Sequence, residues 1–253
     1  TPQVWGVFPA VARQVLRGDV RESDVTATRY VHVPSLQEGK LGFDDQVAQQ
    51  YDVKTFDSDK VPAQTLAVAR SVVEFTDAYR DTPPFDLAPY RQADTLVSTT
   101  GQLHWQPGRS KLDGFFTIDA EATKAVVGFA EGRRCELGSV TIAPKCRYGA
   151  VYVTAAEKDR TLASSSRLLV VAVARARNTG MKVMGDSRLL ERGGPPVLME
   201  PVRATITIRR PGNPTVYLLD HDGCRTEAKL SVTAGTFEID GARDKTCYYL
   251  VVY

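Results

Sequence analysis

The chain of 253 residues, 43% of them hydrophobic, is long enough to bury a sizeable core in one or two domains of about 150 residues each. Its 32 basic and 30 acidic residues leave a formal net charge of +2, and the arginines are spread along the sequence. Nucleic-acid binding needs a concentrated basic face and a spanning helix needs ~20 apolar residues, so neither a nucleic-acid partner nor a membrane span is expected.

The first twenty residues predict an amphipathic helix. Apolar side chains recur there at three- and four-residue spacing, at Trp5, Phe8, Val11, Ala12, Val15 and Leu16. Pro9 would disturb a helix interior, so a short turn that runs into a helix is the alternative. Gly18 suits the C-cap, and we interpret the tripeptide Arg17 to Asp19 as a helix end rather than an adhesion motif.

The next segment predicts mixed structure. Thr28 to Val33 alternates as a strand does, and Val61 to Tyr79 has the periodicity of a second helix. Asp81 to Pro89 carries three prolines and is typical of a linker. We therefore expect a helical or mixed segment with its linker over residues 1–89 and a β-sandwich region over residues 90–253.

Short strand-like runs separated by turn residues follow at regular spacing, which predicts an antiparallel sandwich or a pair of sandwiches. The apolar run Val170 to Ala174 indicates a strand covered on both faces, whereas Ala204 to Arg210 alternates and should have one wet face. The expected strands are 95–99, 115–119, 125–129, 139–143, 150–155, 167–173, 204–209, 216–219, 229–232, 236–239 and 248–253.

The four cysteines fall into two pairs that are local in sequence, Cys135 with Cys146 and Cys224 with Cys247. Each pair lies at the ends of adjacent strand-like runs, so hairpin-type disulfides are expected, and these persist only in an oxidising compartment. The alternative is four unrelated buried thiols, because sequence alone does not fix connectivity.

Three stretches carry a family resemblance: TPQVWGVFPAVARQVLRGDV, DGFFTIDAEATKAVVGF and SSSRLLVVAVARARNTGM. They resemble the C-terminal region of secreted bacterial glycoside hydrolases of the agarase or β-galactosidase kind. The resemblance implies a mainly β fold, with antiparallel β-sandwich domains preceded by a short α/β segment that completes a TIM-type barrel. The chain begins with Thr and shows no signal-peptide pattern, so we expect that the mature start lies upstream of Thr1 or was trimmed.

No catalytic residue is expected within the chain. A retaining glycosidase needs two carboxyl groups about 5 Å apart, and in the resembled enzymes the acid/base glutamate commonly follows an asparagine. Neither Asn178 nor Asn213 precedes a glutamate, so the catalytic glutamates are expected upstream or on another chain. No nucleotide, cofactor or zinc-protease motif is present, and Asp220 to Asp222 indicates a β-turn rather than a metal cluster.

Three side chains are weak candidates for substrate binding. His104 and Trp105 lie in a polar loop bounded by glycine and proline, where an indole could stack on a sugar ring; the favoured alternative packs Trp105 between linker and sandwich. Trp5 could form part of a sugar subsite, but a core position is favoured for Trp5 and Phe8.

The sequence therefore predicts the non-catalytic C-terminal portion of a secreted glycoside hydrolase that acts on a polysaccharide and buttresses its catalytic barrel. The expected partners are that barrel, upstream or as a separate chain, and carbohydrate. Localisation is expected to be secreted, periplasmic or at the cell surface. The alternative is a stand-alone carbohydrate-binding or structural β-protein. Without the barrel, the stripe on Trp5, Phe8, Val15 and Leu16 should remain as an exposed apolar patch.

Overall fold

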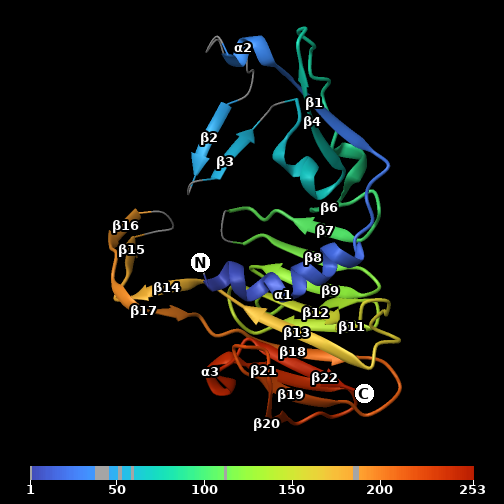
Figure 1. Cartoon of the computed structure of the whole chain (residues 1–253), viewed down its shortest axis with the longest axis vertical. Coiled ribbons are helices and arrows are strands. Elements are labelled where there is room, and N and C mark those ends of the chain that lie inside the picture. The colour runs from blue at the N-terminus through green and yellow to red at the C-terminus, as the bar shows by residue number, and fades with distance from the viewer. Residues whose placement is uncertain (1, 38–45, 51–52, 58–59, 111–112, 185–187) are drawn as a thin grey trace. The chain divides into compact units, whose positions relative to one another are not determined.

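The computed structural model describes residues 2–37, 46–50, 53–57, 60–110, 113–184 and 188–253 (Figure 1). The chain divides into two compact units, which we call the sandwich unit, Thr1–Val20 with Pro107–Tyr253, and the middle unit, Arg21–Gln106. The boundary expected at residues 89 and 90 lies inside the middle unit. Strands make up 46% of the structure and helices 13%, so the mainly β, antiparallel architecture is confirmed. Completion of a barrel stays a prediction.

Two antiparallel sheets form the sandwich unit, and most of their strands lie close to the strand-like runs predicted from the sequence. The larger sheet has the order β8 (Phe115–Asp119), β9 (Thr123–Gly128), β12 (Gly149–Ala155), β13 (Arg167–Val173), β22 (Tyr248–Val252), β19 (Thr215–Leu219), β20 (Arg225–Leu230). The smaller has the order β10 (Cys135–Leu137), β11 (Val140–Pro144), β18 (Arg203–Ile208), β21 (Thr236–Asp240), and α3 (Gly241–Asp244) follows β21.

The core lies between these two sheets, because alternate side chains of each sheet face the other. The smaller sheet contributes Ile142, Ile206 and Ile239, and the larger contributes Val153 and Val170, all fully buried. Strand β18 alternates between buried and less buried residues, which confirms the single wet face predicted for it.

Helix α1 (Pro2–Arg17) covers the opposite face of β12 and β13 (Figure 1). Every residue of β12 is buried, as is every residue of β13 after Arg167. One face of these strands packs into the sandwich core and the other lies under the helix. The prediction that the run Val170 to Ala174 is covered on both faces is therefore confirmed.

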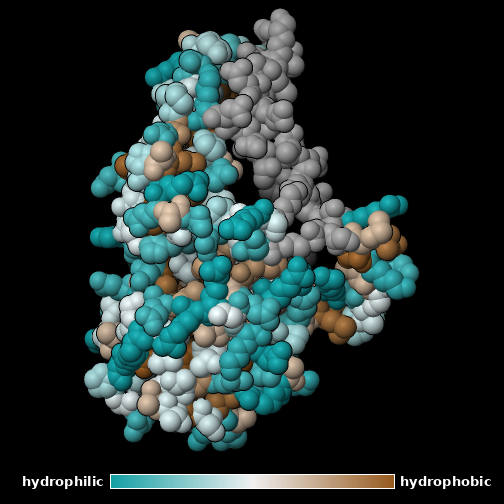
Figure 2. All heavy atoms as spheres, turned by 180° about the vertical axis from the view of Figure 1, so that it is seen from behind, coloured by the Kyte–Doolittle hydropathy of each residue, from teal (hydrophilic) through white to brown (hydrophobic). Residues whose placement is uncertain are grey.

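The sequence predicted no strands between Val173 and Ala204, yet two short hairpins form there. We call residues 175–184 and 188–200 the arm: β14 (Ala176–Thr179) pairs with β17 (Gly194–Met199), and β15 (Lys182–Met184) pairs with β16 (Arg188–Glu191). Figure 2 shows hydrophobic residues gathered on it. The exposed ones are Val183, Met184, Leu189, Leu190, Val197 and Leu198.

The middle unit has a parallel pair, β1 (Thr26–His32) with β4 (Arg70–Thr76), and antiparallel pairs among its other strands. The second helix predicted over Val61 to Tyr79 is wrong, because that segment is a 3-10 turn followed by β4. The other elements are α2 (Val33–Gln37), β2 (Gln46–Gln50), β3 (Val53–Asp57), η1 (Ala63–Ala67), η2 (Ala88–Tyr90), β5 (Arg91–Gln92), β6 (Thr95–Val97) and β7 (Leu103–Gln106).

The predicted disulfides are not formed, since Cys135, Cys146, Cys224 and Cys247 are all free thiols. The Cys146 Sγ donates to the carbonyl oxygen of Tyr148 at 3.6 Å, within its own turn, rather than meeting Cys135. Burial raises the pKa of the Cys135, Cys146 and Cys247 thiols, which keeps them protonated at neutral pH. A secreted localisation therefore stays a prediction without disulfides to support it.

Candidate functional site

The sequence candidates His104 and Trp105 lie in β7 of the middle unit, where Trp105 pairs with Leu96 and His104 with Val97. Both side chains are half-buried, and the His104 ring lies 3.2 Å from the carbonyl oxygen of Gly101. Because successive residues of a strand point to opposite faces, His104 and Trp105 do not line one surface together. Sugar stacking on Trp105 stays a prediction.

Trp5, the third candidate, belongs to α1 of the sandwich unit and is 70% exposed, with Phe8 58% exposed beside it. Their ring centroids are 6.1 Å apart. The core position favoured for these two side chains is therefore wrong. The helix itself is confirmed, and it runs through Pro9 without a break.

The inner face of α1 carries small and basic residues instead. Gly6 is buried so closely that a Cβ built there would lie 2.7 Å from the Val173 Cγ1, and Ala10 is fully buried. Arg13 and Arg17 continue the same stripe at helical spacing. The large apolar side chains consequently face outward; we call these residues the outer helix face: Val4, Trp5, Phe8, Val15 and Leu16.

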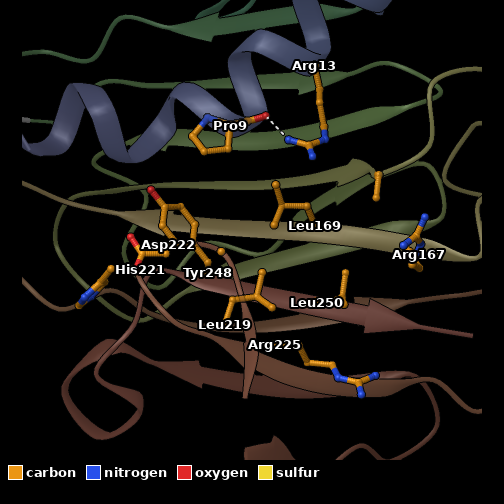
Figure 3. A pocket seen from close by; sticks show the side chains of 12 residues that line it. Pro9, Arg13, Arg167, Leu169, Leu219, His221, Asp222, Arg225, Tyr248 and Leu250 are labelled. Carbon is orange, nitrogen blue, oxygen red and sulfur yellow. Dashed lines mark hydrogen bonds between the residues drawn. The ribbon is translucent and has the colours of Figure 1, made fainter. Parts of the chain in front are cut away.

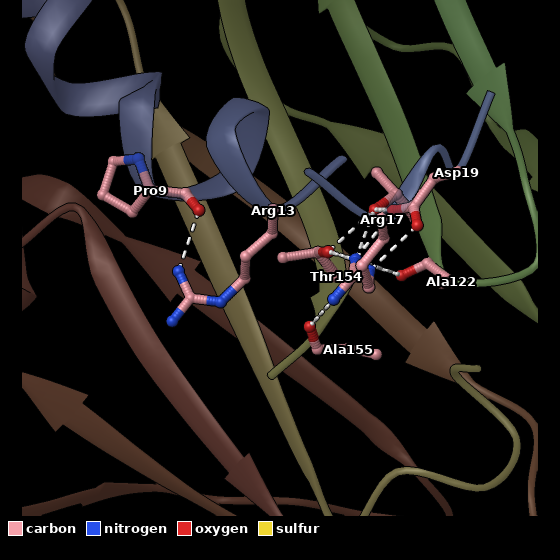
Figure 4. A network of polar contacts seen from close by, with 8 residues as sticks. Pro9, Arg13, Arg17, Asp19, Ala122, Thr154 and Ala155 are labelled. Atoms are coloured by element: carbon pink, nitrogen blue, oxygen red, sulfur yellow. Dashed lines mark hydrogen bonds and ion pairs between the residues drawn. The ribbon is translucent and has the colours of Figure 1, made fainter. Parts of the chain in front are cut away.

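Arg17 and Asp19 anchor the end of α1 to the sheet (Figure 4). The guanidinium holds the Asp19 carboxylate with two hydrogen bonds, Nε to Oδ1 at 2.9 Å and Nη2 to Oδ2 at 2.7 Å. It also donates to the Thr154 Oγ1 at 2.7 Å and to the carbonyl oxygen of Ala155. The side chains of Arg17 and Asp19 are 7% and 2% exposed, so neither is displayed as an adhesion motif would require.

Gly18 makes this anchor possible by reversing the chain at the helix end. Its φ of +65° lies in the left-handed region, where a Cβ is unfavourable. The Gly18 N–H donates to the Val15 carbonyl oxygen at 3.1 Å and the Asp19 N–H to that of Gln14 at 3.0 Å. These two bonds form a Schellman motif, which confirms the predicted C-cap.

A cavity of about 520 Å³ lies on the outer face of β13, β22 and β19, beside α1 (Figure 3). Its floor is apolar, formed by Leu169, Leu219 and Leu250 with the Tyr248 ring. Burial, more than the neighbouring Cys247, raises the pKa of Tyr248, so its phenol stays a neutral hydrogen-bond donor.

Three arginines from separate elements line the same cavity: Arg13 of α1, Arg167 of β13 and Arg225 of β20. The Arg13 Nη1 donates to the Pro9 carbonyl oxygen at 2.8 Å. Burial, together with the nearby Arg17, lowers the pKa of Arg13, although a guanidinium remains charged at neutral pH.

The turn that the sequence predicts at Asp220 to Asp222 borders the cavity on one side. The Asp220 Oδ1 accepts from the N–H groups of Asp222 at 3.0 Å and Cys224 at 2.8 Å, and Gly223 has a φ of +82°. His221 and Asp222 line the cavity. The turn interpretation is confirmed, but sequence reasoning missed the cavity, because nothing local links this turn to Arg13.

Comparison with protein-family models, curated proteins and solved structures gave no match to this chain. Within the described ranges, no helix is both long enough and apolar enough to cross a bilayer. Among those same residues, no group of three or more His, Cys, Asp and Glu side chains is placed to hold a metal ion. The fold therefore defines the class, an antiparallel β protein with a helix laid on one sheet face.

Proposed function

We propose that this chain is the non-catalytic C-terminal portion of a secreted glycoside hydrolase acting on a polysaccharide, and that it buttresses the catalytic barrel. The observation that carries the proposal is the outer helix face. Val15 and Leu16 are 69% and 83% exposed, on the same helix face as Trp5 and Phe8. Exposed apolar surface of this kind is typical of an interface with another protein.

The direction in which α1 presents its side chains supports an interface rather than a loosely packed helix. Gly6 and Ala10 bring the helix backbone close to β13, and the Arg17 anchor fixes its end. The outer helix face is thus held on a rigid support, which lowers the entropic cost of docking. In the enzymes that the sequence resembles, the barrel precedes this region, so the barrel is the occupant we propose.

The test is an association measurement between this chain and the polypeptide encoded immediately upstream of Thr1, produced separately and followed by native mass spectrometry. We expect a complex, and we expect the double variant Val15→Asp with Leu16→Asp to weaken it at least about tenfold. Because both side chains are largely exposed, the variant should stay folded, with a loss of about 1–2 kcal/mol in the stability of the isolated chain, since aspartate is unfavourable in the last turn of a helix.

The matched control is Leu189→Asp on the arm, where the side chain is 54% exposed and lies off the outer helix face. This variant should leave association unchanged. If the upstream polypeptide does not bind, or if it binds the Val15→Asp and Leu16→Asp variant as tightly as the unaltered chain, the buttressing role is wrong. A free chain that binds polysaccharide unaided would instead favour the stand-alone carbohydrate-binding protein.

A further inference from the structure

We infer that the cavity beside α1 binds a small anionic saccharide, a mono- or disaccharide that carries a carboxylate or a sulfate group. The site is separate from the outer helix face, since Arg13 points toward the sheet whereas Val15 and Leu16 point outward. The saccharide class rests on the proposed function, whereas the preference for an anion rests on the cavity alone.

The side chains that line the cavity carry a net positive charge. Three arginines line the cavity against a single acidic residue, Asp222. Arg167 has a carboxylate partner, Glu157, at 3.9 Å. In the part of the chain that the structure describes, no carboxylate forms an ion pair with Arg13 or Arg225. Arg13 donates to the Pro9 carbonyl oxygen and Arg225 lies over the Tyr217 ring, 4.7 Å from its centroid, so an anion in the cavity would add the opposite charge that these contacts do not supply.

The placement of Arg13 strengthens this argument. It is half-buried between the helix and the sheet, and its Nη1 is held by the carbonyl oxygen of Pro9, which fixes the guanidinium beside the cavity (Figure 3). Burial and Arg17 both disfavour its charge, as its lowered pKa records. A bound anion would offset both effects, because opposite charge nearby favours the protonated guanidinium.

The apolar floor of the cavity favours a ligand that is larger and less polar than an inorganic ion. Leu169, Leu219 and Leu250 offer an apolar surface, and the Tyr248 ring lies among them. A sugar ring has a flat apolar C–H face that suits such a floor and hydroxyl groups that suit the Tyr248 phenol. The volume of about 520 Å³ falls within the ~300–1,000 Å³ of small-molecule sites.

The shape of α1 explains why the floor is open. The helix contacts β12 and β13, whereas β22 and β19 lie beyond them in the sheet order. Leu250 and Leu219 therefore lie on a part of the sheet face next to the helix rather than beneath it. The helix does not extend across the whole sheet, and the cavity lies where the sheet face is no longer covered by the helix.

The experiment is a titration of the full chain, by calorimetry, with four probes: D-glucuronate, D-galactose 6-sulfate, neutral D-galactose and inorganic sulfate. We expect the two charged sugars to bind, neutral galactose and inorganic sulfate to bind at least about tenfold more weakly, and binding to weaken as sodium chloride is raised. The two charged sugars also distinguish a carboxylate preference from a sulfate preference.

Three variants complete the test. Arg13→Gln and Arg225→Gln should each weaken the charged sugars about tenfold, as expected for the loss of one charge-assisted hydrogen bond. Arg160→Gln, an exposed arginine that does not line the cavity, should change nothing. Since Arg225 is exposed, its variant folds even if Arg13→Gln does not, and circular dichroism checks both.

The inference is overturned if neutral galactose binds as tightly as the charged sugars, if inorganic sulfate does, if none of the probes binds, or if both cavity variants bind like the unaltered chain. Failure here is distinguishable from failure of the buttressing role. The Val15→Asp and Leu16→Asp variant should lose the companion polypeptide and keep the charged sugar, whereas Arg13→Gln should do the reverse.

Discussion

Replacement of Arg17 by methionine should destabilise the sandwich unit by about 3 kcal/mol. Methionine keeps the length and apolar stem of the side chain but removes its charge and its donors. The Asp19 carboxylate, whose side chain is 2% exposed, would then be a buried anion without its cation. Breaking a buried ion pair on one side typically costs about 3–5 kcal/mol.

The lower end of that range applies because Asp19 keeps at least one other donor. The Thr123 hydroxyl donates to the Asp19 Oδ2 at 2.6 Å, and this bond does not depend on Arg17. Against this, methionine also leaves the carbonyl oxygen of Ala155 and the hydroxyl of Thr154 without the guanidinium. An effect of about 3 kcal/mol corresponds to roughly a hundredfold change in the unfolding equilibrium.

Native-state hydrogen exchange is the appropriate assay, because it resolves the two units where a single melting curve would mix them. Peptides from β12 and β13 should exchange roughly a hundredfold faster in Arg17→Met, whereas peptides from β1 and β4 in the middle unit should be unchanged. Arg160→Met, at an exposed position, is the matched control and should shift exchange by less than about threefold.

A double-mutant cycle decides whether the ion pair itself is responsible. Asp19→Asn alone should also destabilise the unit, but Arg17→Met combined with Asp19→Asn should cost clearly less than the two single losses together. A loss of under about 1 kcal/mol for Arg17→Met, or single effects that add within about 0.5 kcal/mol, would show that the ion pair does not stabilise the unit.

Two further outcomes are expected. Gly18→Ala should cost about 1 kcal/mol in urea denaturation because φ is +65° there, and Gly18→Asn should cost less, since asparagine tolerates that region; equal losses would contradict this. Burial alone would raise the pKa of Asp244, but bonds from Arg243, the Asp240 N–H and Tyr249 outweigh it and hold that pKa below its ordinary value. The resulting stability is present above the ordinary pKa and is lost as pH falls through the lowered one, so Asp244→Asn should flatten the fall of the urea midpoint as the pH is lowered below about 5.

The strand pattern of the sandwich unit could be predicted because the number of buried faces of a strand determines which of its residues are apolar. A strand with one wet face alternates, as β18 does, and a strand covered twice is apolar throughout, as β13 is. The strands of the arm could not be predicted in this way, because neither of their faces is buried. Leu189, Leu190 and Val197 are exposed there, so no periodicity in the sequence marks an inside and an outside.

The helix expected over Val61 to Tyr79 shows how a non-local partner overrides a local pattern. Val72, Val73 and Phe75 fit a helical spacing, but β-branched and aromatic residues also favour strands. Parallel pairing with β1, from Thr26 opposite Arg70 to His32 opposite Thr76, satisfies the backbone of this segment. The partner is more than forty residues away in sequence, so a local window does not contain it.

The candidate site was invisible in the sequence for a related reason. Its arginines come from α1, β13 and β20, and only the fold places them around Leu250. The sequence signals that did exist, an indole at Trp105 and another at Trp5, marked side chains suited to sugars without regard to their surroundings. The fold assigns one to a half-buried strand and the other to an exposed helix face.

The amphipathic pattern predicts the helix α1 correctly, but the core position favoured for Trp5 and Phe8 is wrong because these side chains face away from the sheet. A hydrophobic stripe ordinarily faces the core, but a helix can pack closest to a flat sheet through its smallest residues, and here these are Gly6 and Ala10. That choice turns Trp5 outward and brings Arg13 to the sheet. The two proposals thus depend on opposite faces of one helix, so charge placed at Leu16 and charge removed at Arg13 should have independent effects.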